Sequence, residues 1–169
     1  MENVKKAYQW VLEAPSGGLP ERLCASRDVF RARMDHFYRD LLRAGWSEAE
    51  SGLMAAVVGE IGNNCFDHNL GQWKDHPGCW FDYDKEGEVH EIVIGDRGQG
   101  VLSSLRRVAP SLRTDQEALE VAFSKRVSGR SPERRGNGLK FVRQAINGHP
   151  GRGLFFLSGR GKMSFGGLA

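Results

Sequence analysis

The sequence lacks a hydrophobic run long enough to cross a membrane, and its opening residues are too charged to form the apolar region of a secretory signal. It is also poor in cysteine: Cys24, Cys65 and Cys79 are an odd number of thiols in a chain of 169 residues. A chain of this length buries enough apolar surface to need no disulfide staples. We therefore expect one main domain in the cytoplasm, with reduced thiols and no membrane partner.

The excess of positive over negative charge is small as well. The net charge of +3 and the pI near 8.9 are too weak to indicate a nucleic-acid-binding protein. Cations do outnumber carboxylates between residues 105 and 136, but no aromatic residues are interleaved with them, as binding to single strands would require. We expect this segment to face an anion and do not expect nucleic acid to be the partner.

Regular secondary structure is indicated over most of the chain. Ser47 and Glu50 have the spacing of a capping box, so a helix should begin near Glu48. Apolar spacing and capping signals predict helices at residues 4–12, 27–44, 48–69, 115–123 and 139–146, and alternation around glycine turns predicts hairpins at residues 79–94 and 153–165. This order favours an α+β fold, a two-layer sandwich with a mixed, mainly antiparallel sheet covered by helices on one face.

The helix that ends near Asn69 carries polar groups beside its apolar face. Its apolar stripe consists of Met54, Val57, Val58, Ile61 and Cys65. Glu60, Asn64 and His68 follow one another at intervals of one helical turn along the edge of that stripe. This pattern fits a solvated helix face, or a carboxylate and an amide placed for chemistry, and His68 alone fits a core histidine.

Two glycine motifs lie further along the chain. Asp96-x-Gly98-x-Gly100 follows the first hairpin directly, where a carboxylate can fix a flat ligand through one charge-assisted hydrogen bond, or simply close a tight turn. Gly136-Asn137-Gly138 opens a helix after the basic segment. Unpaired amides at a helix N-terminus attract phosphate, although glycines there also suit an ordinary loop.

In order and spacing these motifs resemble the GHKL superfamily of ATP-binding domains, the group of DNA gyrase, the large heat-shock chaperone, the histidine kinases and the mismatch-repair protein MutL. Glu60-x-x-x-Asn64 looks like the N box of that family, and the two glycine motifs look like its glycine boxes. The resemblance implies a Bergerat-type ATP-binding domain at residues 47–169, preceded by a helical extension at residues 1–46. It is nearest to the small anti-sigma-factor serine kinases of bacterial signal transduction.

The resemblance also implies roles for individual residues. Asp96 would accept a hydrogen bond from the adenine amino group, and Asn64 would be a ligand of Mg²⁺. Glu60 would be the catalytic residue that orients and deprotonates a water or a hydroxyl group. The nucleotide-binding set implied for ATP or ADP is Asn64, Asp96, Gly98, Gly100, Val101, Lys125, Arg126, Gly136, Asn137, Gly138 and Leu139, with Arg130 as a further residue of the lid.

The implied activity is hydrolysis of ATP or transfer of its γ-phosphate to a protein partner. The resemblance does not account for the extension at residues 1–46, and a surface for that partner or for a homodimer is a separate hypothesis for it. The sequence departs from the family in several ways. No helix carries a histidine-kinase phosphoacceptor box, Lys140 stands where many histidine kinases have glycine, and His68-Asn69 stands where the anti-sigma kinases have His-Gly.

Two other readings remain open. The same boxes would serve a module that senses ATP or ADP without turnover, changing its affinity for a partner as a lid becomes ordered. Cys65-x-x-His68 and His76-x-x-Cys79 have the spacing of zinc ligands, although Cys65 lies on the apolar stripe where free cysteine is common. The sequence predicts neither the partner nor the oligomeric state.

Overall fold

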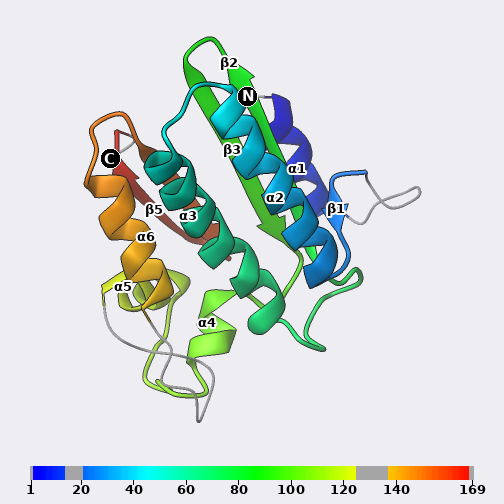
Figure 1. The fold of residues 1–169 in the computed structure, drawn as a ribbon. Helices are drawn as coiled ribbons and strands as arrows, with labels where there is room; N and C mark the ends of the chain where they lie inside the picture. The colour runs from blue at the N-terminus through cyan, green and yellow to red at the C-terminus, as the bar shows by residue number, and fades with distance from the viewer. Residues whose placement is uncertain (1, 14–20, 125–136, 168–169) are drawn as a thin grey trace. The chain divides into compact units, whose positions relative to one another are not determined.

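The computed structural model describes residues 2–13, 21–124 and 137–167, which fold into two compact units, Met1–Gly98 and Gln99–Ala169 (Figure 1). The first unit contains α1 (Glu2–Leu12), β1 (Leu23–Cys24), α2 (Arg27–Arg43), α3 (Glu48–Asp67), β2 (Cys79–Glu86) and β3 (Val89–Asp96). Its strands form an antiparallel sheet in the order β1-β2-β3. The helices that precede residue 47 pack within this unit.

The predicted caps of α2 and α3 are present. Ser26 Oγ accepts a hydrogen bond from the Val29 N–H at 3.3 Å, and Gly45 ends α2 with a φ of +90°. Ser47 Oγ accepts from the Glu50 N–H at 3.2 Å and donates to Glu50 Oε2 at 2.8 Å. Of the predicted apolar stripe on α3, Met54, Val57, Val58 and Cys65 are buried and Ile61 is half-buried. The local signals for these two helices are therefore confirmed.

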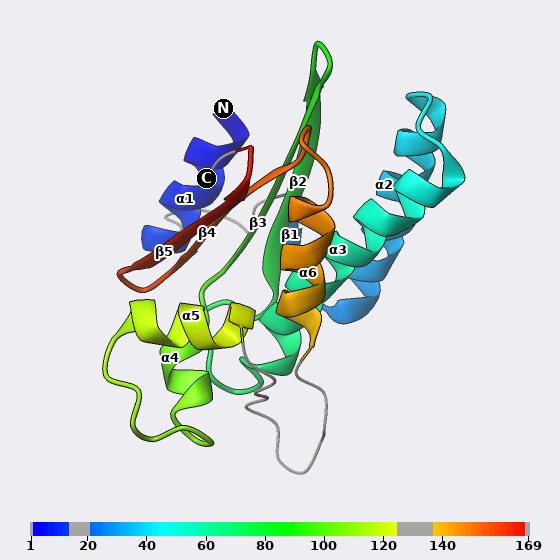
Figure 2. The same ribbon diagram turned by 90° about the vertical axis from the view of Figure 1, so that its left-hand side faces the viewer.

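The sheet of the first unit has helices on both of its faces. Trp80 of β2 packs against Trp10 of α1, with ring centroids 5.9 Å apart. The next residue, Phe81, points to the opposite face, where it meets Phe30 and Phe37 of α2 at 5.4 and 6.0 Å. Figure 2 shows α1 on one side of the strands and α2 with α3 on the other. The prediction of a sheet covered on one face is wrong for this unit, because α1 carries an apolar face of its own.

The second unit contains α4 (Gly100–Leu105), α5 (Asp115–Ser124), α6 (Gly138–Asn147), β4 (Gly153–Ser158) and β5 (Gly161–Gly166). Phe123 of α5 lies at its centre, with ring centroids 5.2 Å from Phe156 and 4.8 Å from Phe165. The start of α5 has the predicted capping box, since Thr114 Oγ1 accepts from the Glu117 N–H at 3.1 Å. The two strands form the predicted terminal hairpin.

Several expectations need correction. Every strand pair among the described residues is antiparallel, so the mixed sheet predicted from the sequence is not found in that part of the chain. β1 and α4 were not predicted, because two residues and six residues are too short to show a hydrophobic period. Within the described ranges, no helix is long and apolar enough to cross a membrane. The fold is α+β, with small antiparallel sheets and flanking helices.

Candidate functional site at the end of strand β3

Asp96 is the last residue of β3, and strand alternation decides which way it points. It lies opposite Cys79 in the β2–β3 ladder, two positions from Ile94, which lies opposite Phe81. Phe81 faces α2, so Asp96 belongs to the face of the sheet that α2 and α3 cover. Its side chain is partly buried.

Hydrogen-bond donors surround the carboxyl group of Asp96. Its Oδ1 accepts from the Gly98 N–H at 2.7 Å and from Asn69 Nδ2 at 2.8 Å, and the Cys65 thiol lies in hydrogen-bond contact with the same carboxyl. Burial raises the pKa of Asp96 above its ordinary value, and the hydrogen bonds, led by that of Gly98, oppose part of this shift. The result is a fixed carboxyl group at the edge of the core.

Asn69 is a site residue to which the sequence analysis gave no role. Its side chain is only 4% exposed, and Nδ2 also donates to the Cys65 carbonyl at 3.0 Å. The amide lies directly against Gly98: a Cβ at Gly98 would come within 2.0 Å of Asn69 Cγ. The predicted importance of Gly98 thus has a physical reason, which is close approach to Asn69. A signal for Asn69 was present, since it follows Cys65 of the apolar stripe by one helical turn and so falls on the same face.

The predicted polar residues of α3 occupy its accessible edge. Glu60 is exposed, and Asn64, one turn later, is half-buried. Within the described residues, neither side chain has a hydrogen bond or an ion pair, so both groups are available to a ligand. His68 is half-buried at the C-cap of α3, where its backbone N–H donates to the Asn64 carbonyl at 3.2 Å. The structure therefore gives His68 a place at the end of the helix.

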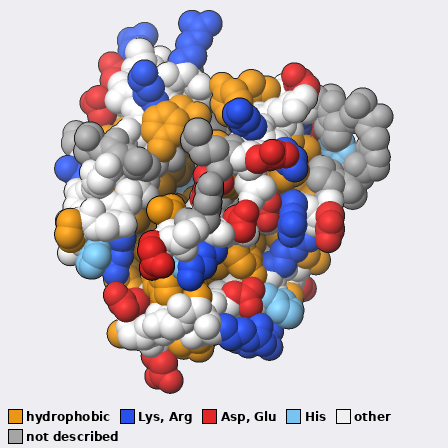
Figure 3. Space-filling view, turned by 90° about the horizontal axis from the view of Figure 1, so that it is seen from above, with side chains coloured by type: hydrophobic (Ala, Val, Ile, Leu, Met, Phe, Trp, Pro, Cys, Tyr) orange, Lys and Arg blue, Asp and Glu red, His pale blue; other side chains and the backbone are white. Residues whose placement is uncertain are grey.

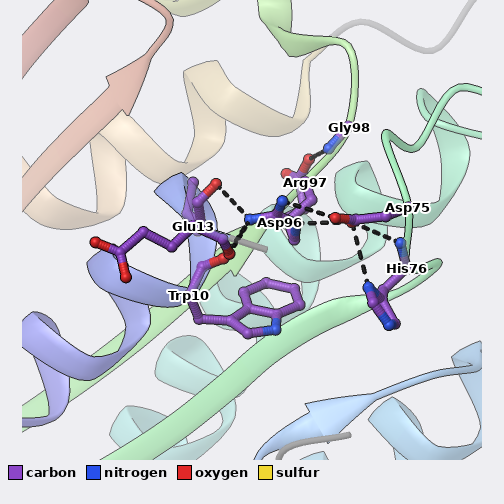
Figure 4. A network of polar contacts seen from close by, with 8 residues as sticks. Trp10, Glu13, Asp75, His76, Asp96, Arg97 and Gly98 are labelled. Carbon is purple, nitrogen blue, oxygen red and sulfur yellow. Dashed lines mark hydrogen bonds and ion pairs between the residues drawn. The ribbon is translucent and has the colours of Figure 1, made fainter. Parts of the chain in front are cut away.

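Arg97, the residue after Asp96, points to the other face of the sheet (Figure 4). Its guanidinium donates to the carbonyls of Trp10, Val11 and Glu13 at the C-terminal end of α1. It also makes a bidentate pair with Asp75, with both N–O distances 2.7 Å. Arg97 is 5% exposed. The sequence analysis assigned it no role.

The remaining predicted residues belong to the second unit. Gly100 has a φ of +79°, and the N–H of Val101 donates to Ser158 Oγ at 2.9 Å, while the Val101 side chain packs into the core. Asn137 is the N-cap of α6 but makes no side-chain capping bond, so the amides of Gly138 and Leu139 are not capped by it. The residues predicted here that lie outside the described ranges are Lys125, Arg126, Arg130 and Gly136.

The zinc reading finds no support in the geometry. Cys65, His68, His76 and Cys79 are all described, and no three Cys, His, Asp or Glu side chains of the described residues are placed to hold a metal ion. Cys79 instead lies against the thiols of Cys24 and Cys65, all three being buried and free. Buried thiols of this kind act as small apolar side chains.

Comparison with protein-family models, with curated proteins and with solved structures finds no match to this chain. Among the described residues on the face shown in Figure 3, positive and negative side chains are interspersed and form no extended basic patch. The strongest candidates for a ligand site are the partly buried carboxyl of Asp96 and, on the helix that covers the same face of the sheet, the polar edge of α3 with Glu60 and Asn64.

Proposed function

We propose that this chain is a Mg-ATP-binding domain of the GHKL type that hydrolyses ATP or transfers its γ-phosphate to a protein partner. The observation that carries the proposal is the fixed carboxyl of Asp96, at a strand end on the same face as α3. A partly buried carboxylate gains free energy when a ligand N–H donates to it, because water solvates it poorly. The adenine amino group is such a donor.

The polar edge of α3 supports the phosphate end of this proposal. Mg²⁺ takes few protein oxygens and keeps water and phosphate oxygens for the rest of its coordination sphere, so one amide oxygen from Asn64 suffices. The uncommitted amide of Asn64 fits that role. When bound, the ion neutralises charge that develops on the phosphates. Glu60 is one turn away, exposed and unpaired within the described residues, so it is suited to orient and deprotonate a water or hydroxyl nucleophile.

The N-terminus of α6 supports phosphate binding within the second unit. Asn137 leaves the first amides of this helix without a side-chain cap, and such amides together with the helix dipole attract anions. In the proposed Bergerat-type fold, α2 and α3 form the helical layer of the first unit. The N-terminal helix α1 is then an addition on the opposite face of that sheet.

Isothermal titration calorimetry with ATP and with ADP, each with and without Mg²⁺, tests the proposal directly. The parent protein should bind Mg-ATP, and Asp96→Asn should abolish binding because the acceptor for the amino group is impaired. Asp28→Asn removes an exposed carboxylate of α2 and serves as the matched control. If Asp96→Asn bound ATP like the parent, the GHKL assignment would be wrong.

Turnover requires a second measurement on a second variant. Glu60→Ala should retain Mg-ATP binding and lose phosphate release or transfer to a partner, because only the proton acceptor is removed. A parent protein that binds ATP but neither releases phosphate nor transfers it to a partner would instead be a nucleotide sensor. That outcome would leave the binding site in place and remove the catalytic role of Glu60.

A further inference from the structure

Two protein donors converge on one oxygen of Asp96. The Gly98 N–H lies 2.7 Å from Oδ1, and Asn69 Nδ2 lies 2.8 Å from the same atom. A carboxylate oxygen has two lone pairs, so these donors fill the accepting capacity of Oδ1. In the described part of the chain no N–H or O–H group donates to Oδ2. Apart from the weak thiol donor of Cys65, the described donors to this carboxyl thus fill Oδ1, and Oδ2 is left for a stronger donor from a ligand.

The orientation of the Asn69 amide is fixed by its surroundings. Its NH₂ group donates to the Cys65 carbonyl at 3.0 Å and to Asp96 Oδ1, which uses both hydrogens. A flipped amide would set its own oxygen against a carbonyl and a carboxylate, which is repulsive. Gly98 closes the remaining side, since its missing Cβ would lie 2.0–2.1 Å from Asn69 Cγ, Nδ2 and Oδ1. Asn69 therefore holds Oδ1 in one arrangement.

The purine bases differ in what they present to a carboxylate. Guanine has a ring N–H beside its exocyclic amine, a pair of donors that engages both oxygens of a carboxylate at once. Adenine has one amino group beside a ring nitrogen that only accepts, so it needs a single free oxygen. A carboxylate with Oδ1 already filled is suited to the second pattern and not to the first.

We infer that Asn69 is a positioning residue that makes Asp96 selective for adenine over guanine, by filling Oδ1 and leaving one oxygen for the base. This inference rests on the proposed nucleotide-binding function and names the residue that sets base selectivity there. Without Asn69, the carboxylate is free to rotate and to accept from two donors. The preference for ATP over GTP should then fall clearly, while the protein stays folded.

Calorimetric titration of the full chain with Mg-ATP and Mg-GTP tests this inference. The parent should prefer ATP, and Asn69→Ala should reduce the ratio of the two affinities by about tenfold, the worth of one hydrogen bond to a charged group. Asn63→Ala is the matched control. Asn63 also lies on α3 and accepts one hydrogen bond, from Arg27 Nη1 at 3.4 Å, but it does not touch Asp96. The ratio of ATP to GTP affinity in Asn63→Ala should equal that of the parent.

Gly98→Ala provides a second route to the same result. Its new methyl group would displace the Asn69 amide from the opposite side, so base selectivity should fall as in Asn69→Ala. The double variant Asn69→Ala/Gly98→Ala should lose no more selectivity than either single variant and should be more stable to heat than Gly98→Ala, because the collision is gone.

The possible outcomes separate this inference from the proposed function. A parent that binds ATP and GTP equally, or folded Asn69→Ala and Gly98→Ala variants with the selectivity of the parent, would overturn the role of Asn69 and leave nucleotide binding intact. A parent that binds neither nucleotide would overturn both. Thermal unfolding of each variant shows that the comparison is made between folded proteins.

Discussion

Asp96 and Arg97 are consecutive residues at the end of β3, and they lie on opposite faces of one sheet. Arg97 is almost completely buried and donates to three carbonyls of α1 and to both oxygens of Asp75. Asp96 is partly buried, and the backbone N–H of Gly98 and the side-chain amide of Asn69 both donate to the same oxygen, Oδ1. Each nitrogen of the arginine side chain donates to an acceptor within the protein, whereas no N–H or O–H group of the described residues donates to Oδ2 of the aspartate.

This difference separates a structural polar group from one that can bind a ligand. A buried charge without partners costs several kcal/mol of folding free energy. The partners of Arg97 remove this cost and connect α1 to the sheet, so Arg97 is a structural group. A carboxylate held by donors on one oxygen is positioned as firmly. Because water is partly excluded from its other oxygen, a hydrogen bond from a ligand there gains more free energy than one from water. The stability of this unit should therefore depend on Arg97, and nucleotide binding should depend on Asp96.

The largest effect is expected for Arg97→Ala. It would leave Asp75 without its bidentate partner and the carbonyls at the end of α1 without a donor, at a cost of about 3 kcal/mol in the free energy of unfolding. Arg31→Ala, at an exposed position of α2, is the control and should change little. Urea unfolding followed by circular dichroism gives both values. Equal stabilities for the two variants would mean that Arg97 does not hold α1.

Asp96→Asn is expected to show the reverse pattern. Nucleotide binding should be abolished, which here means a loss of affinity of at least about 100-fold, the upper end of what a hydrogen bond to a charged group contributes. The free energy of unfolding should change by less than about 1 kcal/mol, because the amide keeps the size of the side chain and burial already disfavours the charged form. Calorimetry and urea unfolding on one preparation compare the two effects. A larger loss of stability than in Arg97→Ala would reverse the assignment of roles.

Asp96 and Asp75, the partner of Arg97, should respond to pH in opposite directions. Burial raises the pKa of Asp96 above the ordinary 3.8, and the hydrogen bonds from Arg97 lower the pKa of Asp75 below it. Between 3.8 and its raised pKa, folded Asp96 keeps a proton that the unfolded chain has released, so its contribution to stability falls as pH rises through that window. The contribution of Asp75 is complete above 3.8 and is lost as pH falls from there toward its lowered pKa.

Urea unfolding at a series of acidic pH values measures these contributions. Subtracting the profile of Asp96→Asn or of Asp75→Asn from that of the parent isolates each group. Nucleotide binding should weaken on acidification at a higher pH than for an ordinary aspartate, since the ionised form of Asp96 is the acceptor. Difference profiles of the same sign for both residues would mean that the pKa values of the two carboxyl groups are not shifted in opposite directions.

The smallest effect is expected for Cys65→Ser. Its hydroxyl group can donate to the Asp96 carboxyl or to the Ile61 carbonyl, the two acceptors beside the thiol, so nucleotide affinity should stay within about threefold of the parent. Cys79→Ser is the matched control: its hydroxyl would be buried among thiols, at a cost of about 1–3 kcal/mol. Thermal unfolding ranks the two variants. A tenfold loss of binding in Cys65→Ser would show that the thiol itself matters to the site.

Local signals in the sequence predicted much of this structure. The capping residues Ser26, Ser47 and Thr114 begin helices as expected, because side-chain caps act within one turn of chain. The hairpins and the apolar stripe of α3 are also confirmed. Short elements such as β1 were missed, because their pairing depends on a partner strand far along the chain.

For the candidate site, the sequence pattern indicated that a carboxylate ends a strand and that Glu60 and Asn64 share one edge of a helix, since both follow from the periods of strand and helix. The hydrogen bonds from Asn69 to Asp96 and from Arg97 to the end of α1 become visible only in the folded chain. Asn69 and Asp96 are 27 positions apart in the sequence, and Arg97 and Val11 are 86 positions apart. Such contacts depend on how whole elements pack, and no local period encodes them.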